Sequence, residues 1–188
     1  RDPAGLRGRA FDEFARFPWP SQEDEAWRRT DLSGLGLEGF SLAPARNTPQ
    51  KEAAEVYRDF VGADDALVLW GPEGTYRRVP AEAEAKGVIF QDLAEALRRW
   101  PELVGPHLGR SVSPANGKFA ALSGAFWNRG LFIYVPKGVD AGVVLRGGYA
   151  PVLGDLHSAV TRTLLGAEPG SRVTFLEDYA AAGPGGEG

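Results

Sequence analysis

The sequence predicts an α+β protein whose first part is mainly helical and whose second part consists of short strands. Charged side chains concentrate in the first hundred residues, whereas glycine concentrates in the remainder. In the first part, apolar residues recur at helical spacing, as at Leu6, Ala10 and Phe14. In the second part they form short runs between turns rich in Gly and Pro, which is typical of strands.

Local end signals define the helices of the first part. We expect helices over residues 3–17, 22–29, 48–61 and 93–99. Thr48 is a good N-cap, Pro49 suits the first helical position and Gly62 suits the end of that helix. Asp92 is the expected N-cap of the last helix. A β-hairpin is expected between them, with strands 66–70 and 75–79.

The second part is expected to begin with a helix and to continue as strands. The helix covers residues 114–126, where Phe119, Leu122 and Phe126 share a face. We expect strands over residues 88–90, 131–135, 143–145, 157–165 and 172–179. Short strands with Gly/Pro turns are typical of a sandwich, a barrel or a solenoid, and periodicity alone does not choose among them.

The composition argues against several classes of function. The net charge of −4 and the pI near 5.3 leave no basic face for nucleic acid. The chain holds no Cys, so these residues offer no disulfide and no thiolate ligand for zinc or a cluster. No apolar run is long enough to cross a membrane. We therefore expect a cytoplasmic protein without a membrane partner.

No motif in the chain predicts catalysis. The G-x-x-x-x-G-K-[ST] sequence of ATPases is absent. The G-x-G-x-x-G match at residues 34–39 follows a predicted helix and not a strand, so we interpret it as a loop. Glu177 and Asp178 are adjacent on a predicted strand and point to opposite faces, so they are no general acid–base pair. We expect no enzyme, and no catalytic, cofactor or metal residues here.

Two segments resemble one known family. Residues 23–33, EDEAWRRTDLS, are similar to the DEEWRYTDLS segment near the start of SufD proteins. Residues 126–139, FWNRGLFIYVPKGV, resemble the entry into the central domain of SufB and SufD proteins. Gly170, Val173, Thr174 and Glu177 match the family's following strand pair. The chain thus resembles the N-terminal part of the SufB/SufD family of iron–sulfur cluster assembly proteins, and SufD more than SufB.

The resemblance implies a fold and partners. It implies an N-terminal helical domain with a small β-hairpin over residues 1–112, and the first turns of a right-handed parallel β-helix over residues 113–188. The remainder of the β-helix and a C-terminal helical domain would follow, so we expect a truncated chain. The resemblance further implies a scaffold that pairs with SufB-like and SufC-like subunits, with a homodimer left open. Iron or an iron–sulfur cluster would belong to the intact complex. A carbohydrate-binding or carbohydrate-active β-solenoid is the alternative.

Four residues are candidates for an interface. Trp27, Arg28 and Asp31 lie close together, and Trp and Arg are favoured at interface hot spots. The simpler interpretation is that Trp27 packs against Trp19 and Phe17, while Asp31 caps a local turn. His157 opens a predicted strand and would face an edge or a partner, or would merely be a packed or exposed histidine.

Overall fold

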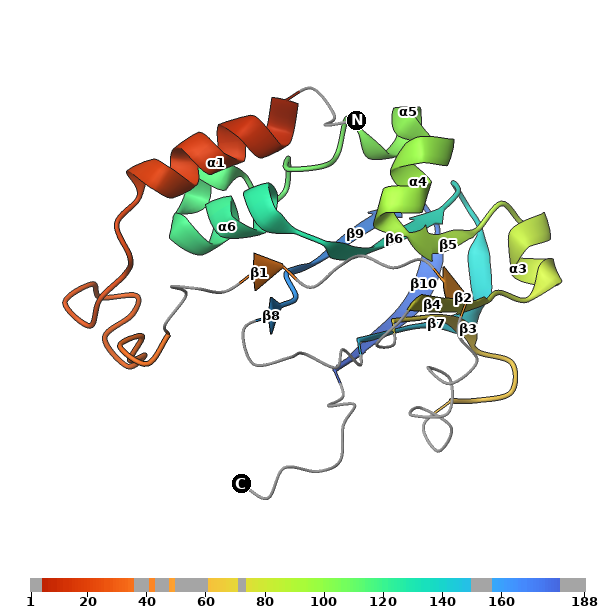
Figure 1. The fold of residues 1–188 in the computed structure, drawn as a ribbon. Helices are drawn as coiled ribbons and strands as arrows, with labels where there is room; N and C mark the ends of the chain where they lie inside the picture. Colours follow the sequence, from red (N-terminus) through yellow and green to blue (C-terminus); the bar gives the residue numbers. More distant parts are fainter. Residues whose placement is uncertain are drawn as a thin grey trace, which may run out of the picture.

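The structure is a computed structural model that describes residues 5–35, 41–42, 48–49, 61–70, 74–149 and 157–179. Most of the helices lie above a three-stranded sheet, which in turn lies above a five-stranded sheet, and the helix at residues 81–85 lies beside the sheets (Figure 1). The helices are α1 (Leu6–Arg16), α3 (Ala81–Ala85), α4 (Leu93–Arg99), α5 (Pro101–Val104) and α6 (Lys118–Phe126), with a 3₁₀ turn at Pro114–Asn116.

Both sheets combine strands from the two parts of the chain. The five-stranded sheet has the order β10-β7-β3-β4-β2, and the three-stranded sheet has the order β5-β6-β9. A separate pair joins β1 to β8 in parallel. The strands are β1 (Ser41–Leu42), β2 (Thr48–Pro49), β3 (Ala66–Trp70), β4 (Gly74–Arg78), β5 (Ile89–Asp92), β6 (Arg129–Val135), β7 (Asp140–Tyr149), β8 (His157–Ser158), β9 (Thr161–Ala167) and β10 (Arg172–Tyr179).

Two hydrophobic cores hold the layers together. The first lies between the sheets, where Val68, Leu145 and Ile133 are fully buried. The second lies between the three-stranded sheet and the helices, and it includes Leu93 and Phe132. Alternate side chains of β6 enter different cores, because Leu131, Ile133 and Val135 face one side and Phe132 faces the other. A strand buried on both faces must be apolar throughout, as the sequence of β6 is.

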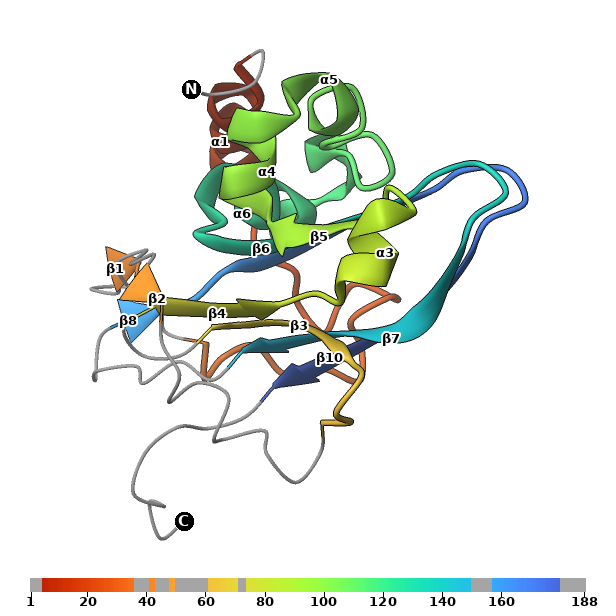
Figure 2. The same cartoon turned by 90° about the vertical axis from the view of Figure 1, so that its right-hand side faces the viewer.

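Two connections run side by side at one end of the molecule. β6 pairs with β9 in parallel, and β7 pairs with β10 in parallel, so the turns between them also lie together (Figure 2). The amide N of Gly138 donates to the carbonyl O of Pro169 at 3.0 Å. Gly138 and Gly170 have φ of 71° and 75°, a region that other residues rarely adopt. The two turns therefore depend on glycine at these positions.

The predicted right-handed parallel β-helix over residues 113–188 is wrong. The described strands form two small sheets that mix parallel and antiparallel pairs, and neither sheet closes or coils. The physical reason is that strands of the first part complete both sheets. β3 lies between β7 and β4, and β5 pairs antiparallel with β6. The carbohydrate-binding β-solenoid requires the same coil, which the described residues do not form.

The first part is also less helical than expected. Residues 22–29 form successive turns in place of a helix, with the amide N of Trp27 donating to the carbonyl O of Asp24 and that of Thr30 to the carbonyl O of Trp27. Thr48 and Pro49 form β2 beside β4, so they do not begin a helix; residues 50–60 lie outside the described part. The helix at α1, the β3–β4 hairpin and the Asp92 cap of α4 are confirmed.

Candidate interaction surfaces

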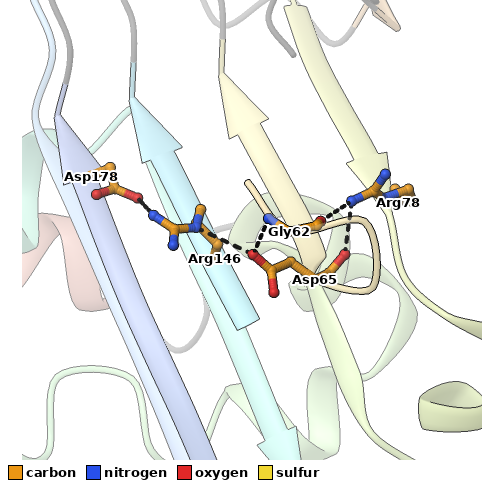
Figure 3. A network of polar contacts seen from close by, with 5 residues as sticks. All are labelled: Gly62, Asp65, Arg78, Arg146 and Asp178. Atoms are coloured by element: carbon orange, nitrogen blue, oxygen red, sulfur yellow. Dashed lines mark hydrogen bonds and ion pairs between the residues drawn. The ribbon is translucent and has the colours of Figure 1, made fainter. Parts of the chain in front are cut away.

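A polar network fixes β10 to the five-stranded sheet. The Arg146 guanidinium of β7 contacts the Asp178 carboxylate of β10 at 2.8 Å and the Asp65 carboxylate at 3.6 Å (Figure 3). Arg78 of β4 donates to the backbone carbonyls of Gly62 and Asp65 at 3.0 and 3.2 Å. The 62–65 turn is thereby tied to three strands. The Arg146 side chain is only 14% exposed, so water screens these ion pairs weakly.

The opposite face of β10 contacts β9. The Thr163 hydroxyl donates to the Glu177 carboxylate at 2.5 Å, and the Thr161 and Tyr179 hydroxyls lie 3.1 Å apart. Glu177 and Asp178 therefore point to opposite faces of the sheet, as predicted. Each carboxylate has a partner of its own, and the two cannot act together on one substrate.

β9 and β10 form an exposed apolar edge. Each is the last strand of its sheet, so one backbone edge of each has no partner among the described strands. Leu165 on β9 is 42% exposed, and Leu176 and Tyr179 on β10 are 42% and 64% exposed. Unpaired N–H and C=O groups beside exposed apolar side chains favour pairing with another strand. We call Leu165, Leu176, Tyr179 and the two backbone edges the strand-edge surface.

A second surface lies on the helices and the turns after α1. Trp27 stacks on Phe119 of α6 with ring centres 5.1 Å apart, and Trp19 meets the same ring edge-on at 5.6 Å. The Lys118 ammonium lies 3.9 Å from the centre of the Phe14 ring. It also donates to the backbone carbonyls of Phe14 and Phe17 at 2.7 and 2.9 Å. This lysine ties the end of α1 to α6.

The structure brings three of the four predicted interface residues into one turn segment. Trp27 is half-buried, and its partner is Phe119, not Phe17. Arg28 is exposed and pairs with Glu25 at 3.3 Å. Asp31 accepts a hydrogen bond from the Ser33 amide at 2.9 Å, which lowers the pKa of its carboxyl and forms the expected local turn.

The four predicted interface residues do not lie on one surface element. Asp31 and Trp19 line a shallow crevice of about 500 Å³. His157 lies in a different element, β8, opposite Ser41 of β1. The role of these four residues as an interface stays a prediction. Sequence reasoning missed Phe119 and Arg146, because their partners are distant in sequence and no local pattern links them.

Asp92 joins the layers of the molecule from a buried position. Its carboxylate accepts hydrogen bonds from the Glu95 amide at 2.9 Å and from the Trp70 indole N–H at 3.2 Å. Burial raises the pKa of this carboxyl, and these hydrogen bonds offset part of the rise. Trp70 in turn stacks on Tyr149, with ring centres 4.6 Å apart. Asp92 is therefore a helix cap and a link between the sheets.

The described residues contain neither a cluster suited to a metal ion nor a helix suited to a membrane. Among the described residues, no three His, Cys, Asp or Glu side chains cluster closely enough to hold a metal ion. Within the same ranges, every helix is too short or too polar to cross a bilayer.

Comparison with known proteins assigns the family. The family model for the SufBD protein N-terminal region matches residues 4–145. An iron–sulfur cluster assembly SufBD family protein of Staphylococcus saprophyticus is 36% identical, over 93% of this chain and 39% of its own length. A protein of the same description from Staphylococcus haemolyticus is 38% identical, over 94% of this chain and 40% of its own length.

A more distant relative agrees. A SufBD family protein of Mycobacterium bovis is 35% identical over 59% of this chain and 13% of its own length. This chain thus spans about two fifths of the length of the staphylococcal relatives. The match of the family model covers most of the chain and includes α1, most buried residues of both cores and the FWNRGLFIYVPKGV segment. The chain therefore belongs to the SufBD family and carries its N-terminal region.

Proposed function

We propose that this chain is the N-terminal part of a SufD-like scaffold subunit of a cytoplasmic iron–sulfur cluster assembly complex. The proposal is supported by the staphylococcal relatives, which are described as iron–sulfur cluster assembly proteins. Residues 23–33 favour the SufD type within the family, because they resemble the segment near the start of SufD proteins. In this proposal the chain contributes surfaces for assembly and no active site of its own, and any iron or cluster belongs to the intact complex.

The strand-edge surface is the observation that carries the proposal. A scaffold needs a rigid surface that recognises another subunit, and strand addition uses backbone hydrogen bonds for affinity. β10 is held rigidly from both faces, by the Arg146–Asp178 ion pair and by the Thr163–Glu177 hydrogen bond. Its outer edge is therefore preorganised, which lowers the entropy lost on association. We propose that a SufB-like subunit pairs here, with a SufC-like ATPase completing the complex.

The test uses the full-length protein co-expressed with a SufB-like and a SufC-like subunit. We expect the three to elute from a size-exclusion column as one complex. Leu176→Asp places a charge on the strand-edge surface and should reduce the yield of this complex. Phe11→Asp is the matched control, because Phe11 is 53% exposed and lies on α1, outside the two edge strands.

Three results would overturn the proposal or part of it. Separate elution of the full-length protein and the SufB-like subunit would contradict the assembly role. Equal yields of complex from Leu176→Asp and Phe11→Asp would place the contact elsewhere. A complex that forms only between two copies of the protein would replace the SufB-like partner by a homodimer.

A further inference from the structure

A crevice between β9 and α6 holds a cation without a carboxylate partner. It has a volume of about 220 Å³ and is lined by His107, Gly109, Ser111, Val112, Ser123, Thr161, Arg162, Thr163 and Leu164. Arg162 is the charged side chain at its wall, and no Asp or Glu contributes to the lining. The crevice is on the helix side of the three-stranded sheet, beside residues 161–164 of β9.

The Arg162 guanidinium is incompletely satisfied. Its Nη2 donates to the carbonyl O of Val112 at 3.5 Å, a long hydrogen bond. Its Nη1 is buried and has no hydrogen-bond partner in the described part of the chain. This atom lies against the backbone of α6, 3.7 Å from the position that a Cβ on Gly124 would take. A guanidinium has five donors, so most of its capacity is unused.

The electrostatic surroundings of Arg162 favour an anion. Burial lowers the pKa of its guanidinium, and the nearby Arg7 guanidinium lowers it further. A charge withdrawn from water and placed beside a like charge is costly unless a counter-charge joins it. None of the ion pairs among the described residues supplies this counter-charge to Arg162. An anion from solution would therefore lower the free energy of the site.

The remaining lining suits the same ligand. Ser111, Ser123 and His107 are among the lining residues, so two hydroxyl groups and an imidazole are available for hydrogen bonding near the crevice. Hydroxyl donors beside an arginine fork are the usual partners of phosphate and carboxylate oxygens. The volume is below that of pockets for drug-sized ligands, so the ligand must be small. We propose that this crevice binds a small oxyanion, with Arg162 as the counter-charge and the two serines as hydrogen-bond donors.

The test is isothermal titration calorimetry of the full-length protein at constant ionic strength. Inorganic phosphate and succinate are titrated separately, so the two arms distinguish a phosphate from a carboxylate ligand. We expect saturable binding of at least one of them. Arg162→Gln should weaken it roughly tenfold or more, because a charge-assisted hydrogen bond is lost. Arg110→Gln is the control. Arg110 is exposed and lies between the lining residues Gly109 and Ser111 in sequence, but it is not itself part of the lining.

A second variant separates binding from folding. Ser123→Leu keeps the arginine and fills the crevice with an apolar side chain, so it should also abolish binding. It keeps the test decisive if Arg162→Gln fails to fold. Absence of saturable binding by the unaltered protein in both arms would overturn the proposal. So would equal affinities in the unaltered protein and Ser123→Leu, or equal losses from Arg162→Gln and Arg110→Gln.

Discussion

Arg146 and Asp178 form an ion pair of 2.8 Å that joins the neighbouring parallel strands β7 and β10. The pair is half of a network, because the same guanidinium also contacts Asp65 before β3. Three segments far apart in sequence thus share one cation on one face of the five-stranded sheet. The ion pairs of Arg146 hold β10 in place, and β10 contributes Leu176 and Tyr179 to the strand-edge surface.

The Arg146–Asp178 pair should contribute measurably to stability. In a double-mutant cycle of Arg146→Ala and Asp178→Ala, we expect a coupling free energy of about 1–2 kcal/mol by chemical denaturation, because Arg146 is well shielded from water. The control cycle uses Arg172 and Asp140, which lie 3.8 Å apart and are 83% and 58% exposed. Its coupling should stay below about 0.5 kcal/mol. Equal coupling free energies in the two cycles would show that burial does not strengthen the Arg146–Asp178 ion pair.

Asp92→Ala should destabilise the protein by about 1–3 kcal/mol, because it removes the cap of α4 and leaves the buried Trp70 N–H without a partner. Denaturant unfolding measures this loss. Asp64→Ala, at an exposed turn position, is the control and should change stability by less than about 0.5 kcal/mol. Similar losses from the two variants would contradict the role of Asp92 as a cap and a link.

The contribution of Asp92 to the free energy of unfolding should decrease as pH rises. Burial raises the pKa of Asp92 in the folded state above its value in the unfolded chain. The unfolded chain therefore loses this proton at a lower pH than the folded protein does. The free energy of unfolding of the unaltered protein, relative to Asp92→Asn, should fall as pH rises through this interval and then stay constant. A relative stability that rises with pH would contradict this assignment.

Lys118→Met should loosen the contact between α1 and α6. The ammonium donates to two backbone carbonyls and lies over the Phe14 ring, so we expect a loss of about 1–3 kcal/mol. Limited proteolysis with trypsin should show faster cleavage after Arg16, the last residue of α1. Lys137→Met, at an exposed turn, should behave like the unaltered protein. Unchanged cleavage in Lys118→Met would mean that the Lys118 contacts do not hold the end of α1 against α6.

A pair of Gly→Ala variants tests the stacking of the two sheets. A Cβ on Gly147 would lie 2.2 Å from Cδ1 of Leu131, so Gly147→Ala should cost about 1–3 kcal/mol through overpacking. Gly8 lies within α1 with open space around it, so Gly8→Ala should stabilise by about 0.5–1 kcal/mol. Thermal unfolding should move in opposite directions for the two variants. A neutral Gly147→Ala would show that β7 and β6 do not face each other closely.

Some local signals were read correctly from the sequence, but the helix signals at residues 22–29 and at Thr48–Pro49 were not, and neither were the non-local pairings. Asp92 was predicted as a cap because Asp precedes an apolar helical pattern directly, and the β3–β4 hairpin was predicted from its turn. The β-helix was wrong because the partners of β6 and β7 include β5 and β3 from the first part of the chain. A strand pattern states which residues are buried, but it does not state which strand lies alongside.

The candidate surfaces show the same division. Trp27 was identified as a candidate interface residue, but its partner Phe119 lies on a helix of the second part and was not identified. Asp65 was not identified as a candidate residue, yet its side chain is only 16% exposed and contacts Arg146. The exposure of Leu176 followed from no pattern, because it depends on β10 being the last strand of its sheet.

Hydrogen–deuterium exchange of the full-length protein, alone and with its SufB-like and SufC-like partners, tests the central claim most directly. If the strand-edge surface is the subunit contact, backbone amides of residues 161–167 and 172–179 should exchange more slowly in the complex, while those of α1 keep their rates. Unchanged exchange in both strands, with slower exchange confined to other segments, would contradict the account.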